Sequence, residues 1–424
     1  MIHYSTIGQG LKRGIVNFTK KVTKGLPKRT QKFVTDMIYG IIASGSSKLS
    51  NISKELKEEI ALKKVSERLG RNLKNLSDTK TLMENYIEVV RPSIGKGTML
   101  LLDPSDVIKP SSPKMEGIGK VYDASEQTFG NGYWTIGAVA LTERRCQPIP
   151  VYEKLYPCKK QGGSGTNAEM KNALEHLRKH FSKDIPRIID RGFDSGDIIK
   201  DLTDNGDKYI IRVNQNRAAI HGGERTYLND VVKGLVCAHG FSYKNKTDQR
   251  FNCKIGMTQV ILPNMGNIKL NLVAVKGLKD DLVLYTNLDE NIENIAERVV
   301  RAYLMRWRIE EFYEFKKQRF SFEDFRVRSL KSIQSLDTLL TIASGYIAIL
   351  SDKVDEEPYV IELITVSGRI QKPFAFIRKK KFFLYAILDG IQRLLAFLRS
   401  GIHSFFSLPK PSPQLSFFDS YFLG

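Results

Sequence analysis

Cysteine is scarce in this chain, and its four thiols form no metal-binding pattern. Cys146, Cys158, Cys237 and Cys253 show no Cys-x-x-Cys spacing. Adding His239 to the last two still falls short of the four ligands of a structural zinc site. We therefore expect reduced thiols in a cytosolic protein.

Hydrophobic runs long enough to cross a membrane are also lacking. The two most apolar stretches are Leu336 to Leu350 and Phe382 to Leu398. Asp337 and Asp352 limit the first and Asp389 interrupts the second, whereas about 20 apolar residues are needed to span a bilayer. The N-terminus has bases but no apolar core followed by a small-residue cleavage site. We expect no membrane partner, and a cytoplasmic, nucleoid-associated protein.

Acidic residues are outnumbered by basic ones, 46 against 66, which gives a net charge of +20 over 424 residues. Such a charge attracts polyanions through a term that weakens steeply with salt. The bases concentrate at Lys12 to Lys32, Arg301 to Lys331 and Arg378 to Lys381. These runs fit a DNA partner, but they would equally suit RNA or an anionic membrane surface.

One segment places an acid among bases and aromatics at helical spacing. On a helix at roughly 100° per residue, Tyr303, Arg306, Glu310 and Lys317 fall within about 60° of one another. Apolar residues line the opposite face, and we expect one long helix from Ile292 to about Arg319. By itself, such a stripe is typical of a solvated helix face with an internal ion pair.

Two aspartates precede this helix at the ends of expected strands. The apolar run Thr98 to Leu102 leads to Asp103, and Arg187 to Ile189 leads to Asp190. An isolated Asp after a strand is commonly a turn former or a helix cap. The two aspartates therefore indicate a functional site only in combination with the helix that carries Glu310.

The segment has the spacing Tyr-x2-Arg-x3-Glu-x6-Lys and the sequence Arg-Trp-Arg-Ile-Glu-Glu-Phe around Glu310. Both features resemble the third signature of DDE transposases of the insertion-sequence-four group. The resemblance implies an α/β fold with an RNase H-like core, a mixed sheet flanked by helices. The expected order of three strands, a helix, a strand, a helix and a strand agrees with such a core. In that core the strands of Asp103 and Asp190 lie side by side.

The resemblance also implies roles for individual residues. Asp103, Asp190 and Glu310 would be the catalytic acids and would hold two Mg²⁺ ions, with Mn²⁺ as a plausible substitute. The DNA-binding residues would be Tyr303, Arg306, Trp307 and Lys317. For Trp307, stacking on a base and packing beneath the sheet both remain open.

The implied reaction is the cleavage of transposon ends and the joining of the freed 3′-hydroxyl to target DNA, with or without a hairpin intermediate. The partners would be double-stranded DNA, as terminal inverted repeats and target, and a second copy of the chain in a synaptic homodimer. Some members stack a flipped base on a Trp in the β insertion. This chain has no Trp there, and Phe241, Tyr243 or Phe251 are possible substitutes.

Rival acids lie beside the chosen ones. Asp106 lies three residues after Asp103. Asp194 lies four residues after Asp190 and, together with Ser195, is placed to cap a helix. Glu314 lies almost as near the charged helix face as Glu310. Only the family spacing selects Glu310.

We expect five regions. Residues 1–92 form a helical N-terminal DNA-binding region, in which Ser47 to Leu56 and Val65 to Leu76 have the rhythm of a helix-turn-helix. Residues 93–213 form the first part of the core, 214–286 a β-rich insertion, 287–345 the second part of the core and 346–424 a helical C-terminal region.

Two alternatives remain open. The chain could be a catalytically silent or domesticated DNA-binding relative, although all three acids are present. It could also be another RNase H-like nuclease, such as a junction resolvase, although the Tyr-Arg-Glu-Lys stripe is not expected there.

Overall fold

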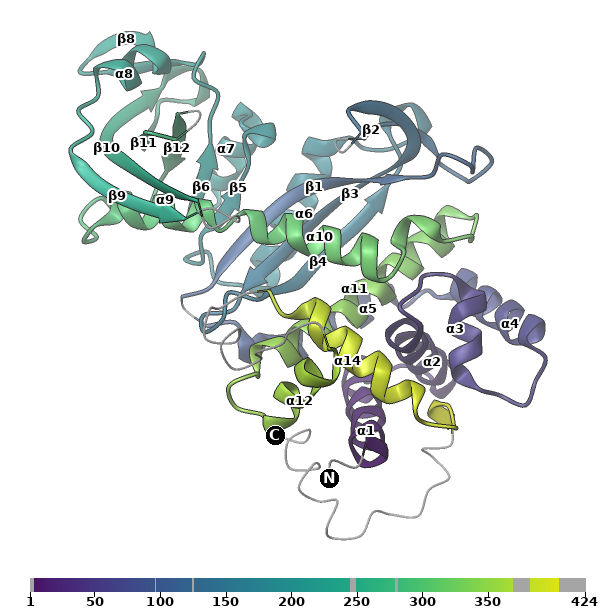
Figure 1. Ribbon diagram of the computed structural model, residues 1–424. Coiled ribbons are helices and arrows are strands. Elements are labelled where there is room, and N and C mark those ends of the chain that lie inside the picture. The colour runs from purple at the N-terminus through teal and green to yellow at the C-terminus, as the bar shows by residue number, and fades with distance from the viewer. Residues whose placement is uncertain are drawn as a thin grey trace. The chain divides into compact units, whose positions relative to one another are not determined.

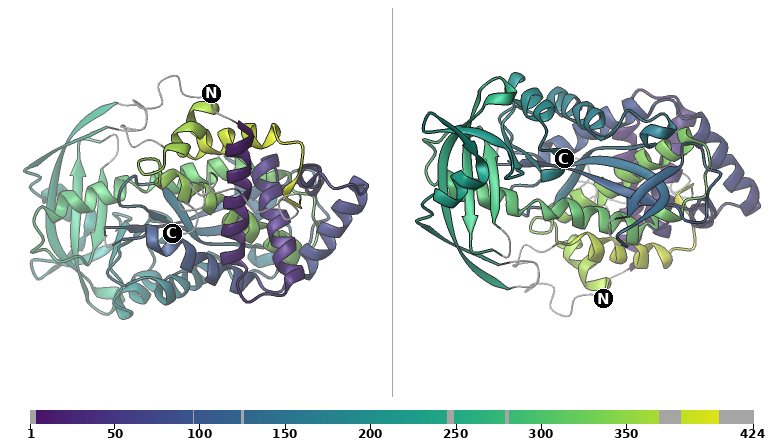
Figure 2. Two further views of the ribbon diagram at one scale, coloured as in Figure 1. Left: turned by 90° about the horizontal axis from the view of Figure 1, so that it is seen from below. Right: turned by 90° about the horizontal axis from the view of Figure 1, so that it is seen from above.

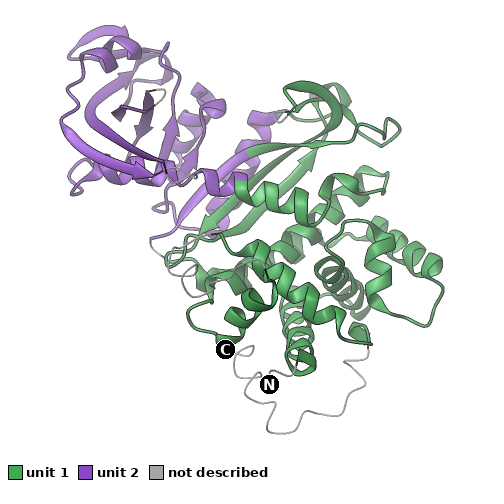
Figure 3. Ribbon diagram, viewed as in Figure 1, with its two compact units in different colours: residues 1–95, 104–165, 311–424 green, residues 96–103, 166–310 purple. Residues whose placement is uncertain are grey.

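The computed structural model describes residues 4–95, 97–123, 126–244, 249–278, 281–368 and 382–403. It confirms the predicted fold class, a mixed α/β protein with a large mixed sheet and many helices (Figure 1). The chain forms two compact units (Figure 3). The first comprises residues 1–95, 104–165 and 311–424, and the second comprises residues 96–103 and 166–310. The basic run Arg378 to Lys381 lies outside the described residues.

Helices dominate the first unit at both ends of its sequence. The N-terminal helices are α1 (Tyr4–Val22), α2 (Lys28–Ser44), α3 (Leu49–Leu56), α4 (Leu62–Asn75) and α5 (Thr79–Val90), followed by the 3₁₀ turn Arg91–Ser93. The C-terminal helices are α11 (Leu330–Asp352), α12 (Pro358–Val366) and α14 (Leu384–Ala396). Helices α3 and α4 stand where a helix-turn-helix was expected.

The two ends of the described chain pack together through a buried lysine. Lys12, on α1, is fully buried, and its Nζ donates to the carbonyls of Ser400 at 2.6 Å and Gly401 at 3.0 Å. Burial, and then nearby Lys57, lower the pKa of Lys12 to about 8. Figure 2 shows α1 and α2 beside the C-terminal helix α14. Lys12 is thus a structural base, although it belongs to a run that the sequence offered for DNA.

Helix α11 is long and apolar enough to cross a membrane by length and composition, but 83% of its most apolar stretch is buried inside the protein. It packs on β4 (Pro148–Tyr156) and on α2. A core position therefore accounts for its apolar character.

The strands of the first unit form an antiparallel set. β2 (Gly119–Asp123) pairs with β3 (Thr128–Leu141), which pairs with β4. The later part of β1 (Met99–Ile108) runs beside β3, and the Lys109 amide then donates to the Asn131 carbonyl at 2.7 Å. This pairing carries β1 past Asp103, which was expected to end the strand.

The second unit contains the parallel part of the sheet. Leu100 to Leu102 of β1 pair in parallel with β5 (Arg187–Ile189), and β5 pairs in parallel with β6 (Tyr209–Arg212). The two strands that lead to Asp103 and Asp190 are therefore neighbours in the sheet, as predicted. Helices α6 (Thr166–His180) and α7 (Gly196–Asp204) connect these strands.

Antiparallel strands continue the sheet from β6 in the order β12, β11, β10, β7, β8, with β9 also paired to β10. Their bounds are β7 Ala218–His221, β8 Glu224–Tyr227, β9 His239–Lys244, β10 Arg250–Leu262, β11 Ile268–Lys276 and β12 Leu282–Thr286. The expected β-rich insertion also contains a short helix, α8 (Leu228–Gly234).

The expected long helix is broken in two, which corrects the prediction of a single helix from Ile292 to Arg319. Helix α9 spans Ile295–Leu304 and α10 spans Trp307–Arg319. Between them, the amide of Arg306 donates to the Tyr303 carbonyl at 2.9 Å, three residues back rather than four. Tyr303 and Glu310 therefore belong to different helices, and helical periodicity does not relate them.

In the first unit, α10 continues against β3, where glycine makes room for it. A Cβ on Gly137 would lie 2.6 Å from the Tyr313 hydroxyl. A larger residue at position 137 would displace this part of the helix.

Candidate functional site

Three carboxylates meet in the second unit because of the strand pairing. Asp103 follows the fully buried Leu100 to Leu102 of β1, and Asp190 follows the buried strand β5. Parallel neighbours deliver their following residues to the same edge of a sheet. Glu310 enters from the first turn of α10.

One guanidinium contacts all three acids. Arg306 Nη1 lies 2.8 Å from Asp103 Oδ2, and its Nη2 donates to Glu310. Its Nε lies 3.9 Å from Asp190 Oδ1. The break between α9 and α10 places this side chain at the centre of the cluster. Arg306 was predicted to bind DNA, and here its partners are the acids themselves.

A phenol completes the cluster. The Tyr303 hydroxyl donates to Asp190 Oδ1 at 2.6 Å, and its ring is buried. Burial and the neighbouring Asp190 carboxylate raise the pKa of Tyr303 well above the ordinary value, so the phenol stays protonated as a donor. In this structure Tyr303 orients a carboxylate rather than facing solvent.

The acids differ in how readily they ionise. Burial raises the pKa of Asp103 to about 7; Arg306 opposes the rise, while Asp190 and Glu310 add to it. Burial also acts to raise the pKa of Asp190, but Arg306 and the Tyr303 hydrogen bond outweigh it and lower the value. Near neutral pH, Asp190 is therefore ionised while Asp103 is poised to gain or lose its proton.

The donor chemistry of the cluster fits hard divalent cations, which prefer carboxylate oxygens. A positive group, Arg306, already faces all three acids, as a cation would. The spacing is wider than a single ion needs. Among the described His, Cys, Asp and Glu side chains, the one trio with ligand atoms all within 4.8 Å of one another is Asp36, Glu58 and His403, in the first unit. Binding of a single ion by all three acids would therefore require them to draw closer as Arg306 leaves.

Trp307 and Lys317 have contacts of their own. The guanidinium of Arg308 stacks over the half-buried Trp307 ring at 4.4 Å from its centre, so at least one ring face is already covered. Lys317 belongs to the first unit, where its Nζ lies 2.8 Å from Asp106 and 3.2 Å from Glu323.

The rival acids have structural partners. Asp106 pairs with Lys317, and Asp194 accepts from the Asn214 amide at 2.8 Å and from Arg217 at 2.7 Å. Ser195, not Asp194, caps α7. Glu314 is exposed, one turn beyond Glu310. The contact with Arg306 thus distinguishes Glu310 from Glu314, which helical spacing alone could not do.

The aromatic residues considered for base stacking in the insertion are partly covered. Phe241 is buried, with the Arg301 guanidinium 4.7 Å above its ring and Tyr243 stacked at 6.5 Å. Phe251 is half-buried. Phe241 therefore presents no open ring face for a base in this structure.

Sequence reasoning missed a buried ion cluster that supports strand β5. Arg187, at the start of the strand, and Asp207 are fully buried 3.2 Å apart, and Arg178 donates to Asp207 at 2.6 Å. Together they join α6, β5 and the turn before β6. The sequence gives no sign of this pairing, because it depends on contacts between residues that lie far apart along the chain.

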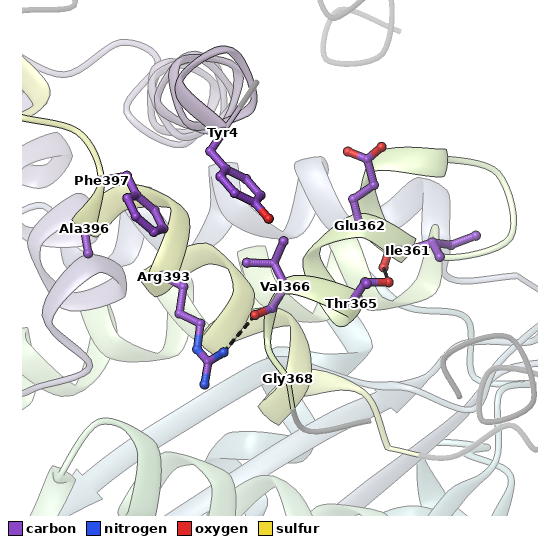
Figure 4. A pocket seen from close by; sticks show the side chains of 9 residues that line it. All are labelled: Tyr4, Ile361, Glu362, Thr365, Val366, Gly368, Arg393, Ala396 and Phe397. Atoms are coloured by element: carbon purple, nitrogen blue, oxygen red, sulfur yellow. Dashed lines mark hydrogen bonds between the residues drawn. The ribbon is translucent and has the colours of Figure 1, made fainter. Parts of the chain in front are cut away.

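A concave surface of about 790 Å³ lies among the helices of the first unit (Figure 4). Tyr4 stacks on Phe397 at 5.6 Å on its wall. Its polar side chains Arg393 and Thr365 donate to the carbonyls of Val366 and Ile361. The surface offers apolar area for packing and no converging catalytic groups.

Comparison with known proteins adds one family match. Residues 156–345 match the transposase DDE domain. The matched segment includes Asp190, Tyr303, Arg306, Glu310 and Lys317, and it begins after Asp103. Among solved structures, the chain is similar to a piggyBac transposase synaptic complex with hairpin DNA. The identity is 11% and the TM-score 0.45, over 97% of this chain and 87% of that chain. No curated protein matches the chain.

Proposed function

We propose that this chain is a DNA transposase that cleaves transposon ends and joins the 3′-hydroxyl to target DNA by two-metal-ion phosphoryl transfer. The observation that carries the proposal is the meeting of Asp103, Asp190 and Glu310 around a single positive group, Arg306. The match of residues 156–345 to the transposase DDE domain supports it. The insertion-sequence-four assignment rests on the Tyr-Arg-Glu-Lys spacing.

Each residue takes a role that follows from its contacts. Asp103, Asp190 and Glu310 hold divalent ions, which when bound stabilise charge on the attacking and leaving oxygens. Tyr303 holds Asp190 in place through its hydroxyl. Arg306 neutralises the acids in this structure, and with ions bound its forked guanidinium would suit a DNA phosphate.

The remaining DNA contacts are spread over the chain. Lys317 supplies a point charge for a phosphate once it leaves Asp106, and Trp307 borders the acids on α10. In the N-terminal region, α4 exposes four bases that suit a DNA groove or backbone, Lys63, Lys64, Arg71 and Lys74, with the exposed Glu67 among them. The protein would act as a synaptic homodimer on inverted repeats, in the cytoplasm at the nucleoid, with Mg²⁺ or Mn²⁺.

The test is a cleavage and strand-transfer assay with DNA that carries candidate terminal inverted repeats, in Mg²⁺ and in Mn²⁺. Asp190→Asn and Glu310→Gln are expected to abolish both steps while retaining DNA binding. The matched control is Glu314→Gln, which changes an exposed acid one turn away and should cleave normally. Equal cleavage by all four proteins would rule out the assigned acids.

A catalytically silent DNA-binding protein is the second candidate. Arg306 favours it in one respect, because it neutralises the acids without any metal. In the same assay this candidate predicts specific binding to the repeats by the unaltered protein, with no cleavage in either metal.

A further inference from the structure

The β2–β3 hairpin of the first unit carries two exposed aromatic side chains that touch. Tyr122 on β2 stands directly opposite Phe129 on β3. Their ring centres are 5.4 Å apart in an edge-to-face arrangement. Tyr122 is 40% exposed and Phe129 68% exposed, whereas Val121 on the other face of the ribbon is buried. Large aromatic side chains that are exposed together on a hairpin are typical of a binding surface.

The same face of the ribbon carries a base and an amide. Side chains alternate between the faces of a strand, so Lys120 shares the face of Tyr122. Lys120 is exposed and stands opposite Asn131. The ribbon therefore presents two aromatic rings beside an ammonium and a carboxamide group.

This ribbon is connected to Lys317 through a short series of contacts within the first unit. A Cβ on Gly130, next to Phe129, would lie 3.3 Å from Ile108. The Ile108 amide donates to Glu323 at 2.9 Å, and Glu323 lies 3.2 Å from the Lys317 ammonium. The aromatic pair thus belongs to the same packed region as a lysine that the proposed function assigns to a DNA phosphate.

We propose that the exposed face of this ribbon, formed by Lys120, Tyr122, Phe129 and Asn131, binds an unpaired nucleobase of the DNA substrate. The inference rests on the proposed function for the identity of the substrate. Tyr122 and Phe129 supply ring surface for stacking, which is tolerant of base identity. Lys120 supplies the charge that attracts the adjoining phosphate.

A nucleobase fits this face better than an apolar protein surface does. The patch consists of two rings beside a charged and a polar side chain, on a chain with a net charge of +20. An aromatic platform beside bases is how proteins hold single-stranded nucleic acid. A contact between this face and the same face of a second copy would bring two Lys120 ammonium groups together, and they would repel each other.

The experiment measures binding of the full-length protein to short oligonucleotides in EDTA, where no cleavage occurs. The probes are a single strand, a duplex, and a duplex with a one-nucleotide gap opposite 2-aminopurine, whose fluorescence is quenched by stacking. The variant is Tyr122→Ser combined with Phe129→Ser. The matched control is Tyr227→Ser, which removes an aromatic that is 59% exposed on β8.

The double variant is expected to bind the single strand and the gapped duplex about tenfold or more weakly, as for loss of one stacked base. It should lose the 2-aminopurine quenching and keep its duplex affinity and melting temperature. Unchanged single-strand affinity and quenching would overturn the inference. So would an equal loss in Tyr227→Ser, or a change from dimer to monomer in the double variant without DNA. Because the readout is binding, it is independent of whether the protein cleaves repeats.

Discussion

Arg306 lies 2.8 Å from Asp103, in the position where the proposed reaction needs a cation. The same guanidinium reaches Glu310 and approaches Asp190. Gathering three partly buried carboxylates is costly unless positive charge compensates them. Arg306 therefore lets the sheet edge fold with its acids in place, and it competes with any ion that binds them.

This competition predicts the effect of Arg306→Gln on metal binding. Without DNA, the variant should have a lower melting temperature than the unaltered protein, because three partly buried acids lose their counter-charge. Mg²⁺ or Mn²⁺ should then raise its melting temperature more than it raises that of the unaltered protein, since ligand binding stabilises by mass action. Thermal melts across a metal titration measure both effects.

Asp103→Asn on the Arg306→Gln background is the control, and it should reduce the additional metal response. An equal metal-induced shift in the unaltered protein and in Arg306→Gln would contradict the competition.

Tyr303→Phe separates two roles for the phenol. The 2.6 Å hydrogen bond to Asp190 predicts that the hydroxyl positions a metal-binding carboxylate. The variant should therefore need more Mg²⁺ for half-maximal cleavage, with roughly 10- to 100-fold weaker apparent metal affinity, as expected for loss of a group that orients a ligand. DNA affinity in EDTA should change little. A large loss of DNA affinity with an unaltered metal requirement would instead assign Tyr303 to a phosphate.

The parallel strand pair could be predicted from local patterns together with the family resemblance. Apolar runs of strand length precede both Asp103 and Asp190, and the resemblance to an RNase H-like core implies that those runs lie side by side. The α/β class was an implication of the same resemblance.

The break in the long helix could not be predicted in this way. The run from Ile295 to Arg319 has no proline or glycine to mark an end. The break occurs where Arg306 turns toward three acids that lie far apart in sequence. Helical spacing therefore grouped Tyr303 with Glu310 on a continuous helix that the structure does not contain. Strand β2 (Gly119–Asp123) could not be predicted because it is short and depends on its pairing with β3.

Two adjacent lysines on α10 should differ in how their substitution affects stability and DNA binding. Lys316 is buried, and its ammonium lies 2.6 Å from Glu153 and also contacts Asp337. Lys316→Met would leave both acids buried without a counter-charge, so we expect the free energy of unfolding to fall by about 3–5 kcal/mol. Burial already raises the pKa of Asp337 to about 7, and its protonation at low pH should relieve part of the loss.

Lys317→Met is the matched control, because Lys317 is partly exposed beside Asp106 and Glu323. Its free energy of unfolding should change by about 1 kcal/mol or less. Its DNA affinity should fall, and the salt dependence of binding should become shallower by about one charge. Chemical denaturation and filter binding measure the two quantities. Equal destabilisation by both substitutions would contradict the difference in burial.

His403 predicts a pH-dependent attachment of the C-terminal segment to the N-terminal helices. Its Nε2 lies 3.1 Å from both Asp36, on α2, and Glu58, after α3. The Asp36 carboxylate, within hydrogen-bonding distance, raises the pKa of His403; burial and Lys32 oppose the rise, and Glu58 adds to it. Arg68 also faces this site, donating to Glu58 at 2.6 and 2.7 Å.

A histidine whose pKa is raised on folding stabilises the folded state most below its unfolded pKa of about 6.5, and the contribution disappears as the pH rises through the folded value. His403→Gln should therefore lower the melting temperature at pH 5.5 and have little effect at pH 9. His176→Gln is a comparison histidine on α6, in the second unit, and should not reproduce this pattern. A loss for His403→Gln that is equal at both pH values would mean that packing of the ring, rather than its charge, holds the segment.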